Sequence, residues 1–223
     1  MYEKVKIDDI YFLVTGGGVM FGGGEPLLHS DFIAEFRKIC GDRWKIYLET
    51  SLNVDRSNVE QLVEMVDHWI VDVKDWNNDI YLRYTGRDNG VVKANLEYLI
   101  SKGLADRITV RVPTIPGYNT ASDVESTIAE LTRMGIRYID QFEYLQDVAS
   151  TFKKDVSINK RLKAGKLKCE VLKDIRVHAA RCNNIPYKPH ECNHKGCATG
   201  CCPMCDEELR WVTEEYYKVI SND

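Results

Sequence analysis

Short apolar runs and amphipathic stretches alternate along residues 19 to 144. The apolar runs have the length of buried strands, and the stretches between them place apolar residues three and four positions apart, as one helical face requires. In the stretch 30–40, for example, Phe32, Ile33 and Phe36 share a face. The pattern predicts strands at 19–21, 45–50, 68–74, 107–117 and 137–144, and helices at 30–40, 55–66, 90–103 and 122–135.

Helix signals support this division. Asp55 is placed as an N-cap, Ser122 and Glu125 have the spacing of a capping box, and Gly103 and Gly135 stand at helix ends. Strand–helix alternation of this kind predicts an α/β fold with a parallel sheet, either open or curved into a barrel.

Polar residues gather where the predicted strands end. In α/β folds, ligands bind at the carboxyl ends of parallel strands, so these residues are expected to lie together in a site. The residues are Glu25, Glu49, Thr50, Ser51, Asp72, Lys74, Arg111, Glu143 and Tyr144.

Composition narrows the functional classes. The chain has 223 residues, of which 44% are hydrophobic, enough for one domain with a small appendage. No apolar run is long enough to span a membrane, and the charged start MYEKVKIDDIYF lacks a signal peptide, so a cytoplasmic location is expected. A net charge of −4 argues against a nucleic-acid partner.

The glycine-rich stretch GGGVMFGGGEPLLH, residues 16–29, first suggests a phosphate loop. It does not fit either known spacing. G-x-G-x-x-G would need glycine at Phe21, and G-x-x-x-x-G-K-[ST] would need a lysine where Gly24 stands. Glu25 also carries the wrong charge for a phosphate, so the glycines need another explanation.

The segments GGGVMFGGGEPLL, LETS, WIVDVKDW, RYTGRDNG, VRVPTIPGYN and IDQFEY follow one another as they do in glycyl-radical-enzyme activating enzymes. Over residues 14 to 145 the chain therefore resembles the radical S-adenosylmethionine (SAM) superfamily, and specifically the pyruvate formate-lyase-activating type. The resemblance implies a partial parallel (β/α) barrel of about five strands, with the first strand missing and a Cys-rich C-terminal extension.

The resemblance also implies roles for single residues. Gly23, Gly24 and Glu25 match the turn whose backbone meets the amino group of SAM, where a Cβ would block the approach. Glu49, Thr50 and Asp72 match residues around a cation near the methionine carboxylate. Further matches close to the cofactor are Ser51, Lys74 and Arg111. A zwitterion with a sulfonium needs groups of both charges, as this set provides.

One departure concerns catalysis. The C-x3-C-x2-C loop that holds the catalytic [4Fe–4S] cluster in this family lies upstream of the glycine turn, and here no cysteine precedes Cys40. As given, the chain is expected to be inactive, with a catalytic cluster only if an upstream segment exists.

The tail differs from the activating enzymes. Five of the eight cysteines lie within residues 192–205, and crowded thiols in a reducing compartment more often hold metal than form disulfides. The expected ligands of a [4Fe–4S] cluster or of zinc are Cys192, Cys197, Cys202 and Cys205, with Cys201 or a histidine, His190 or His194, as a substitute. The expected domains are 1–148, a partial radical SAM core, and 149–223, a metal-binding extension.

Two functions remain open. The first is a radical SAM activating enzyme, or a fragment of one, that generates a glycyl radical on a partner such as pyruvate formate-lyase and takes electrons from flavodoxin or ferredoxin. The alternative is a non-catalytic binding or assembly module with a metal-stabilised tail.

Overall fold

The computed structural model describes residues 1–144, 154–192 and 202–221, which divide into two compact units. The sheet unit comprises Gly18–Gln146. The helical unit combines Met1–Gly17 with Asp147–Asp223. The unit boundary after Gln146 lies close to the domain boundary expected after residue 148, but the helical unit also takes in the first 17 residues.

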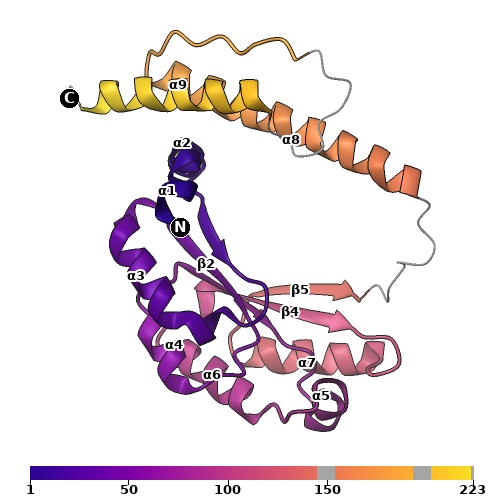
Figure 1. The fold of residues 1–223 in the computed structure, drawn as a ribbon. Helices are drawn as coiled ribbons and strands as arrows, with labels where there is room; N and C mark the ends of the chain where they lie inside the picture. Colours follow the sequence, from indigo (N-terminus) through magenta and orange to yellow (C-terminus); the bar gives the residue numbers. More distant parts are fainter. Residues whose placement is uncertain (145–153, 193–201, 222–223) are drawn as a thin grey trace. The chain divides into compact units, whose positions relative to one another are not determined.

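A five-stranded parallel sheet forms the sheet unit, and its strands lie side by side in sequence order. The sheet does not close, so the predicted partial parallel α/β barrel is confirmed (Figure 1). Each connection returns to the next strand through a helix, as parallel strands require. The strands are β1 (Gly18–Phe21), β2 (Lys45–Thr50), β3 (His68–Asp72), β4 (Ile108–Thr114) and β5 (Tyr138–Glu143).

The connecting helices cover one face of this sheet (Figure 1). Side chains alternate along the strands between that covered face and the opposite one. In β2, for instance, Ile46 and Leu48 are fully buried, while Glu49 between Leu48 and Thr50 is only half-buried. The helices are α3 (Ser30–Cys40), α4 (Arg56–Leu62), α5 (Asn78–Thr85), α6 (Gly90–Ser101) and α7 (Ala121–Arg133).

The sequence predicted α3 to the residue, whereas several other bounds and details differ. The helix expected at 55–66 ends at Leu62. The capping box of α7 is formed by Thr120 and Asp123, so the prediction of Ser122 and Glu125 was wrong by two residues. The short helix α5 was not predicted.

Gly18 explains part of the first glycine triplet. It opposes Lys45 where β1 begins to pair with β2. A Cβ at Gly18 would overlap the backbone of Lys45, so the two strands can approach only with glycine at this position.

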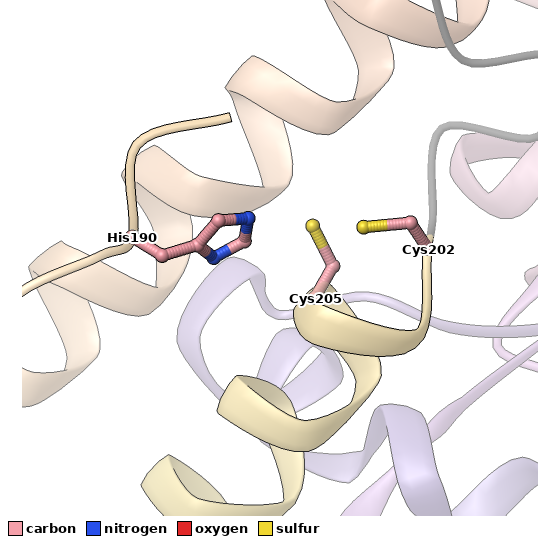
Figure 2. A group of neighbouring side chains, drawn as sticks. All are labelled: His190, Cys202 and Cys205. Carbon is pink, nitrogen blue, oxygen red and sulfur yellow. The ribbon is translucent and has the colours of Figure 1, made fainter. Parts of the chain in front are cut away.

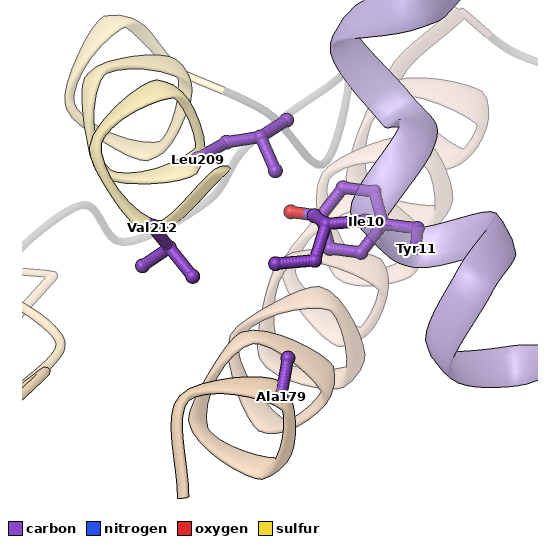
Figure 3. Packing of buried hydrophobic residues seen from close by; sticks show 5 residues of the cluster. All are labelled: Ile10, Tyr11, Ala179, Leu209 and Val212. Carbon is purple, nitrogen blue, oxygen red and sulfur yellow. The ribbon is translucent and has the colours of Figure 1, made fainter. Parts of the chain in front are cut away.

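The helical unit contains α1 (Tyr2–Val5), α2 (Asp9–Thr15), α8 (Lys154–Cys182) and α9 (Pro203–Ile220). Its small apolar cluster joins both ends of the chain (Figure 3). The buried members are Ile10, Tyr11, Ala179, Leu209 and Val212. No helix in the described ranges combines the length and the apolar character needed to cross a membrane.

A buried arginine lies within the same unit. The Arg176 side chain is 0% exposed, and its guanidinium donates to the hydroxyls of Tyr11 (2.5 Å) and Tyr187 (3.2 Å). A third bond, of 3.1 Å, reaches the Glu208 carboxylate. These bonds connect α2, α8 and α9 through polar groups where apolar packing is sparse.

Candidate functional site

The glycine turn that follows β1 has the backbone that only glycine adopts easily. Gly23 and Gly24 have φ values of +77° and +63°, in the left-handed region. Apart from the adjoining residues of the turn, no atom of the described residues lies within 4 Å of the position a Cβ would take at either glycine. Positive φ accounts for these two glycines, and the close approach of a ligand stays a prediction.

Glu25 attaches this turn to the end of β2. Its Oε1 accepts hydrogen bonds from the Thr50 hydroxyl (2.6 Å) and the Leu27 N–H (3.2 Å). Its Oε2 accepts from the backbone N–H (3.0 Å) and the hydroxyl (2.6 Å) of Ser51. Because both oxygens are satisfied within the protein, Glu25 positions the backbone of the turn and leaves that backbone as the part available to a ligand.

A row of charged residues crosses the face of the sheet that bears no connecting helices. Glu49, Asp72 and Arg111 alternate with buried residues on neighbouring strands, and Asp72 is in register with Arg111. Arg111 Nη1 lies 2.5 Å from Glu49 Oε1, and its guanidinium lies 4.6 Å from the centre of the Phe142 ring. The row therefore holds a carboxylate and a guanidinium at fixed positions near the strand ends.

Lys74 extends this row beyond β3. Its ammonium donates to Asp72 Oδ2 (2.5 Å) and lies 2.9 Å from the Tyr144 hydroxyl. Burial opposes the positive charge, but the bonds to Asp72 and Tyr144 outweigh it and raise the pKa of Lys74 above its usual value. Asp72 Oδ1 is buried and has no hydrogen-bond partner among the residues that the structure describes. One carboxylate oxygen is thus left without a partner among the described residues and is available to another group.

A cavity of about 460 Å³ adjoins this edge of the sheet. Its lining includes Glu25, Ser51 and Lys74 from the strand ends. It also includes Tyr81 of α5 and Arg87, just beyond that helix. The polar residues therefore border a space large enough for part of a small ligand.

All nine residues predicted for the SAM site lie in the sheet unit, eight in the turn or close to strand ends and Arg111 in the middle of β4, but their grouping differs from the expectation. Thr50 is buried and bonds to Glu25, whereas Glu49 lies on the opposite face and pairs with Arg111. Tyr144 was expected in the site only as a polar strand-end residue, and Phe142 was not assigned a role. The alternation of side chains along β5 could have indicated Phe142, because it places this residue on the face of Arg111.

In the tail the structure brings together three possible metal ligands (Figure 2). One ligand atom from each of His190, Cys202 and Cys205 lies within 4.8 Å of the others. Cys192 does not belong to this group, and Cys197 lies outside the described residues. Of the four predicted cysteine ligands, Cys202 and Cys205 belong to the group found among the described residues, and its third member is His190.

The open parallel sheet, with its connecting helices on one face and its charged row near the strand ends, defines the chain as a partial (β/α) barrel. The family model described as the Radical SAM superfamily matches residues 6–131, and the chain belongs to this superfamily.

Similar proteins include activating enzymes for glycyl radical enzymes of several types. The chain is 33% identical over 122 residues to the indoleacetate decarboxylase activating enzyme of Tractidigestivibacter scatoligenes, covering 54% of this chain and 38% of that protein. It is 34% identical over 127 residues to the (2S)-3-sulfopropanediol dehydratase activating enzyme of Klebsiella oxytoca, covering 56% and 39%. The chain thus spans less than half the length of these relatives.

The fold is also similar to that of a solved structure. SuiB of Streptococcus suis matches with a TM-score of 0.50 at 15% identity, over 68% of this chain and 35% of that one. At this identity the similarity supports the partial-barrel fold and nothing finer.

Membership of the superfamily implies SAM and a [4Fe–4S] cluster as cofactors, and the two fit the described residues unequally. The glycine turn, the opposite charges of the row and the unpartnered Asp72 Oδ1 fit a small zwitterion. A cluster needs several thiolates. The described part of the sheet unit contains one cysteine, the buried Cys40. The described part of the sheet unit therefore does not provide the donor set of a cluster.

Proposed function

We propose that this chain is the SAM-binding part of a glycyl-radical-enzyme activating enzyme. The observation that carries the proposal is the charged row, which includes the ion pairs Glu49–Arg111 and Asp72–Lys74. Lys74 lines the same cavity as Glu25 of the glycine turn. The relatives support the activating role, since they are activating enzymes of a decarboxylase and a dehydratase.

Each residue then has a definite task. The turn at Gly23 and Gly24 offers its backbone to the amino group, while Arg111 and Lys74 attract the carboxylate of SAM. Asp72 and Glu49 balance the sulfonium and any cation beside it. When bound, SAM supplies the chemistry that removes a hydrogen atom from a glycine of the partner protein.

The partner that we propose is a glycyl radical enzyme, and pyruvate formate-lyase is the particular candidate that the sequence segments favour. The electrons that this chemistry consumes would come from flavodoxin or ferredoxin. The catalytic [4Fe–4S] cluster would need thiolates beyond the one cysteine that the described sheet residues contain.

Calorimetric titration of the chain with SAM tests the site. We expect weak binding, because the protein side chains act alone, and we expect Asp72→Ala and Arg111→Ala each to weaken it about tenfold or more, as loss of a charged hydrogen bond implies. The matched control is the exposed pair Asp106 and Arg137, whose atoms lie 3.1 Å apart in the same unit. Asp106→Ala and Arg137→Ala should leave SAM binding unchanged. Binding that survives both site substitutions would place SAM elsewhere.

The second candidate function is a non-catalytic binding module, and the single cysteine in the described sheet residues favours it. The two candidates differ in what an added cluster-binding segment would do. Joined to a C-x3-C-x2-C segment and reconstituted with iron and sulfide, an activating-enzyme core should cleave SAM reductively. A binding module should bind its ligand and leave SAM intact.

A further inference from the structure

We propose that the helical unit holds one zinc ion, bound by His190, Cys202 and Cys205, with the thiolate of Cys169 as the fourth ligand. The site is separate from the charged row of the sheet unit. It does not depend on the proposed SAM chemistry, so either proposal can fail without the other.

Two of the ligands lie at the start of α9. Cys202 is the N-cap of this helix and Cys205 lies in its first turn, in the sequence C-P-M-C. The positive end of the helix dipole stabilises thiolates at these positions. Two cysteines separated by two residues are a recurrent half of structural zinc sites.

His190 supplies the third ligand from a different segment. Its Nε2 is buried and has no hydrogen-bond partner among the residues placed in the structure. A buried imidazole nitrogen without a partner is costly, and a metal ion would satisfy it. In Figure 2 the imidazole extends toward the two sulfur atoms.

The other ring nitrogen of His190 faces a carboxylate. Nδ1 lies 2.8 Å from Glu208 Oε1, although the N–H direction is not aligned for a hydrogen bond. The same oxygen accepts the backbone N–H of His190 at 2.5 Å, and the second carboxylate oxygen is held by Tyr187 (2.9 Å) and Arg176 (3.1 Å). A histidine ligand in a zinc site usually has such a carboxylate behind it, which orients the ring and fixes the tautomer.

Cys169 of α8 provides the fourth donor. It is buried, and its Sγ lies 3.6 Å from the Sγ of Cys205. Two thiolates on one tetrahedral zinc ion lie about 3.8 Å apart, given Zn–S bonds of about 2.3 Å. The ligand atoms of His190, Cys202 and Cys205 lie within 4.8 Å of one another. Cys169 is outside this group, so its side chain would have to rotate toward the other ligands to complete the site.

The ligand chemistry distinguishes zinc from an iron–sulfur cluster. A [4Fe–4S] cluster is typically held by four cysteine thiolates, whereas three thiolates and one imidazole form a common structural zinc site. A cavity of about 500 Å³ borders His190, Glu208 and Trp211 on one side of the proposed site.

Metal analysis of the purified chain, followed by removal of the metal and titration with zinc or cobalt(II), tests the proposal. We expect one equivalent of zinc and a cobalt(II) spectrum with thiolate charge-transfer bands. His190→Ala, Cys202→Ser and Cys205→Ser should lose the ion, and Cys169→Ser should weaken its binding. The control Cys182→Ser, at an exposed cysteine of α8, should keep it.

Glu208→Gln keeps the shape of the side chain and removes its charge. It should lower zinc affinity about 10- to 100-fold while one equivalent still binds at high zinc, an effect that general misfolding would not produce. The proposal is overturned if the ligand variants retain zinc. A brown protein with cluster absorption overturns it in favour of iron, and a disulfide between Cys202 and Cys205 in the isolated protein overturns it in favour of redox chemistry.

Discussion

In the sheet unit the charged residues lie near the edge of a large apolar core, whereas in the helical unit a charged residue lies inside the core. The carboxyl-edge row of Glu49, Asp72 and Arg111 is half-buried, above strands whose covered face is filled by residues such as Leu48 and Trp69. In the helical unit Arg176 is fully buried among a few apolar residues. A unit with a large core can leave its charges free for a ligand, but a unit with a small core uses charge to hold itself together.

The largest expected effect comes from Arg176→Ala, which removes the polar centre of the helical unit. The Glu208 carboxylate and the Tyr187 hydroxyl would each lose their hydrogen bond from Arg176. Breaking a buried ion pair lowers the free energy of unfolding by about 3–5 kcal/mol. Hydrogen exchange followed by mass spectrometry should show faster exchange along α8 and α9 and unchanged exchange in β2 to β4. Arg210→Ala, an exposed position on α9, is the control. Equal protection of α8 in the Arg176 variant would show that apolar packing alone holds the unit.

An intermediate effect is expected at Asp67, which lies at the amino end of the sheet. Its carboxylate accepts from the Ile46 N–H (2.8 Å), from Lys45 (3.1 Å) and from Arg37. Burial opposes the charge, but these three donors outweigh it and lower the pKa of Asp67 below its usual value. A lowered pKa stabilises the fold above the unfolded-state value, and this stabilisation is lost as the pH falls through the folded-state value.

Asp67→Asn should therefore lower the free energy of unfolding by about 1–2 kcal/mol at pH 7, as expected for the loss of hydrogen bonds to a charged group. The difference in unfolding free energy between the variant and the unchanged protein should shrink as the pH falls below about 4, the usual pKa of an aspartate. Urea unfolding followed by the fluorescence of Trp44 and Trp69 measures it. Asp106→Asn, at an exposed ion pair, should show no such pH dependence. A constant difference at every pH would mean that the charge of Asp67 contributes nothing.

The smallest effect is expected at the start of α7. Thr120→Ala removes the side chain that accepts from the Asp123 N–H, and loss of an N-cap costs about 1 kcal/mol. Thr120→Ser should keep most of the stability that Thr120→Ala loses, because serine also has a hydroxyl that can cap the helix. Ser122→Ala, at the position that the sequence predicted as the cap, should change stability little. The same urea titration compares the three variants, and a larger loss at Ser122 would reassign the cap.

The sequence was sufficient for the parts of the fold that follow local periodicity. The five strands and α3 repeat apolar residues at strand or helix spacing, so each could be predicted without its neighbours. The helix α5 could not, because it is short and buries only Ile80 and Tyr81. The cap of α7 was misplaced because Thr120–Asp123 and Ser122–Glu125 have the same spacing, and only the backbone distinguishes them.

The site could be predicted as a location but not as a set of contacts. Parallel strands bring their carboxyl ends to one edge, which placed Glu49, Asp72 and Arg111 together. Which of them pair depends on the register of β2 to β4, and single-sequence patterns do not determine register. Nothing in the sequence pattern indicates that Arg176 is buried. It lies in a basic stretch that suggests a solvated surface, and the partner at Tyr11 is 165 residues away.

The long sequence separation between Tyr11 and Arg176 has a consequence for how the protein folds during its synthesis. The helix α2 is synthesised before the sheet unit, but its partners α8 and α9 are synthesised after it. Until they leave the ribosome, Ile10 and Tyr11 have no core to enter, while the whole of the sheet unit is already available to fold. Closing so long a loop adds a slow, entropically costly step. The helical unit should therefore be completed last, and a stalled chain ending before α8 would display α2 to chaperones.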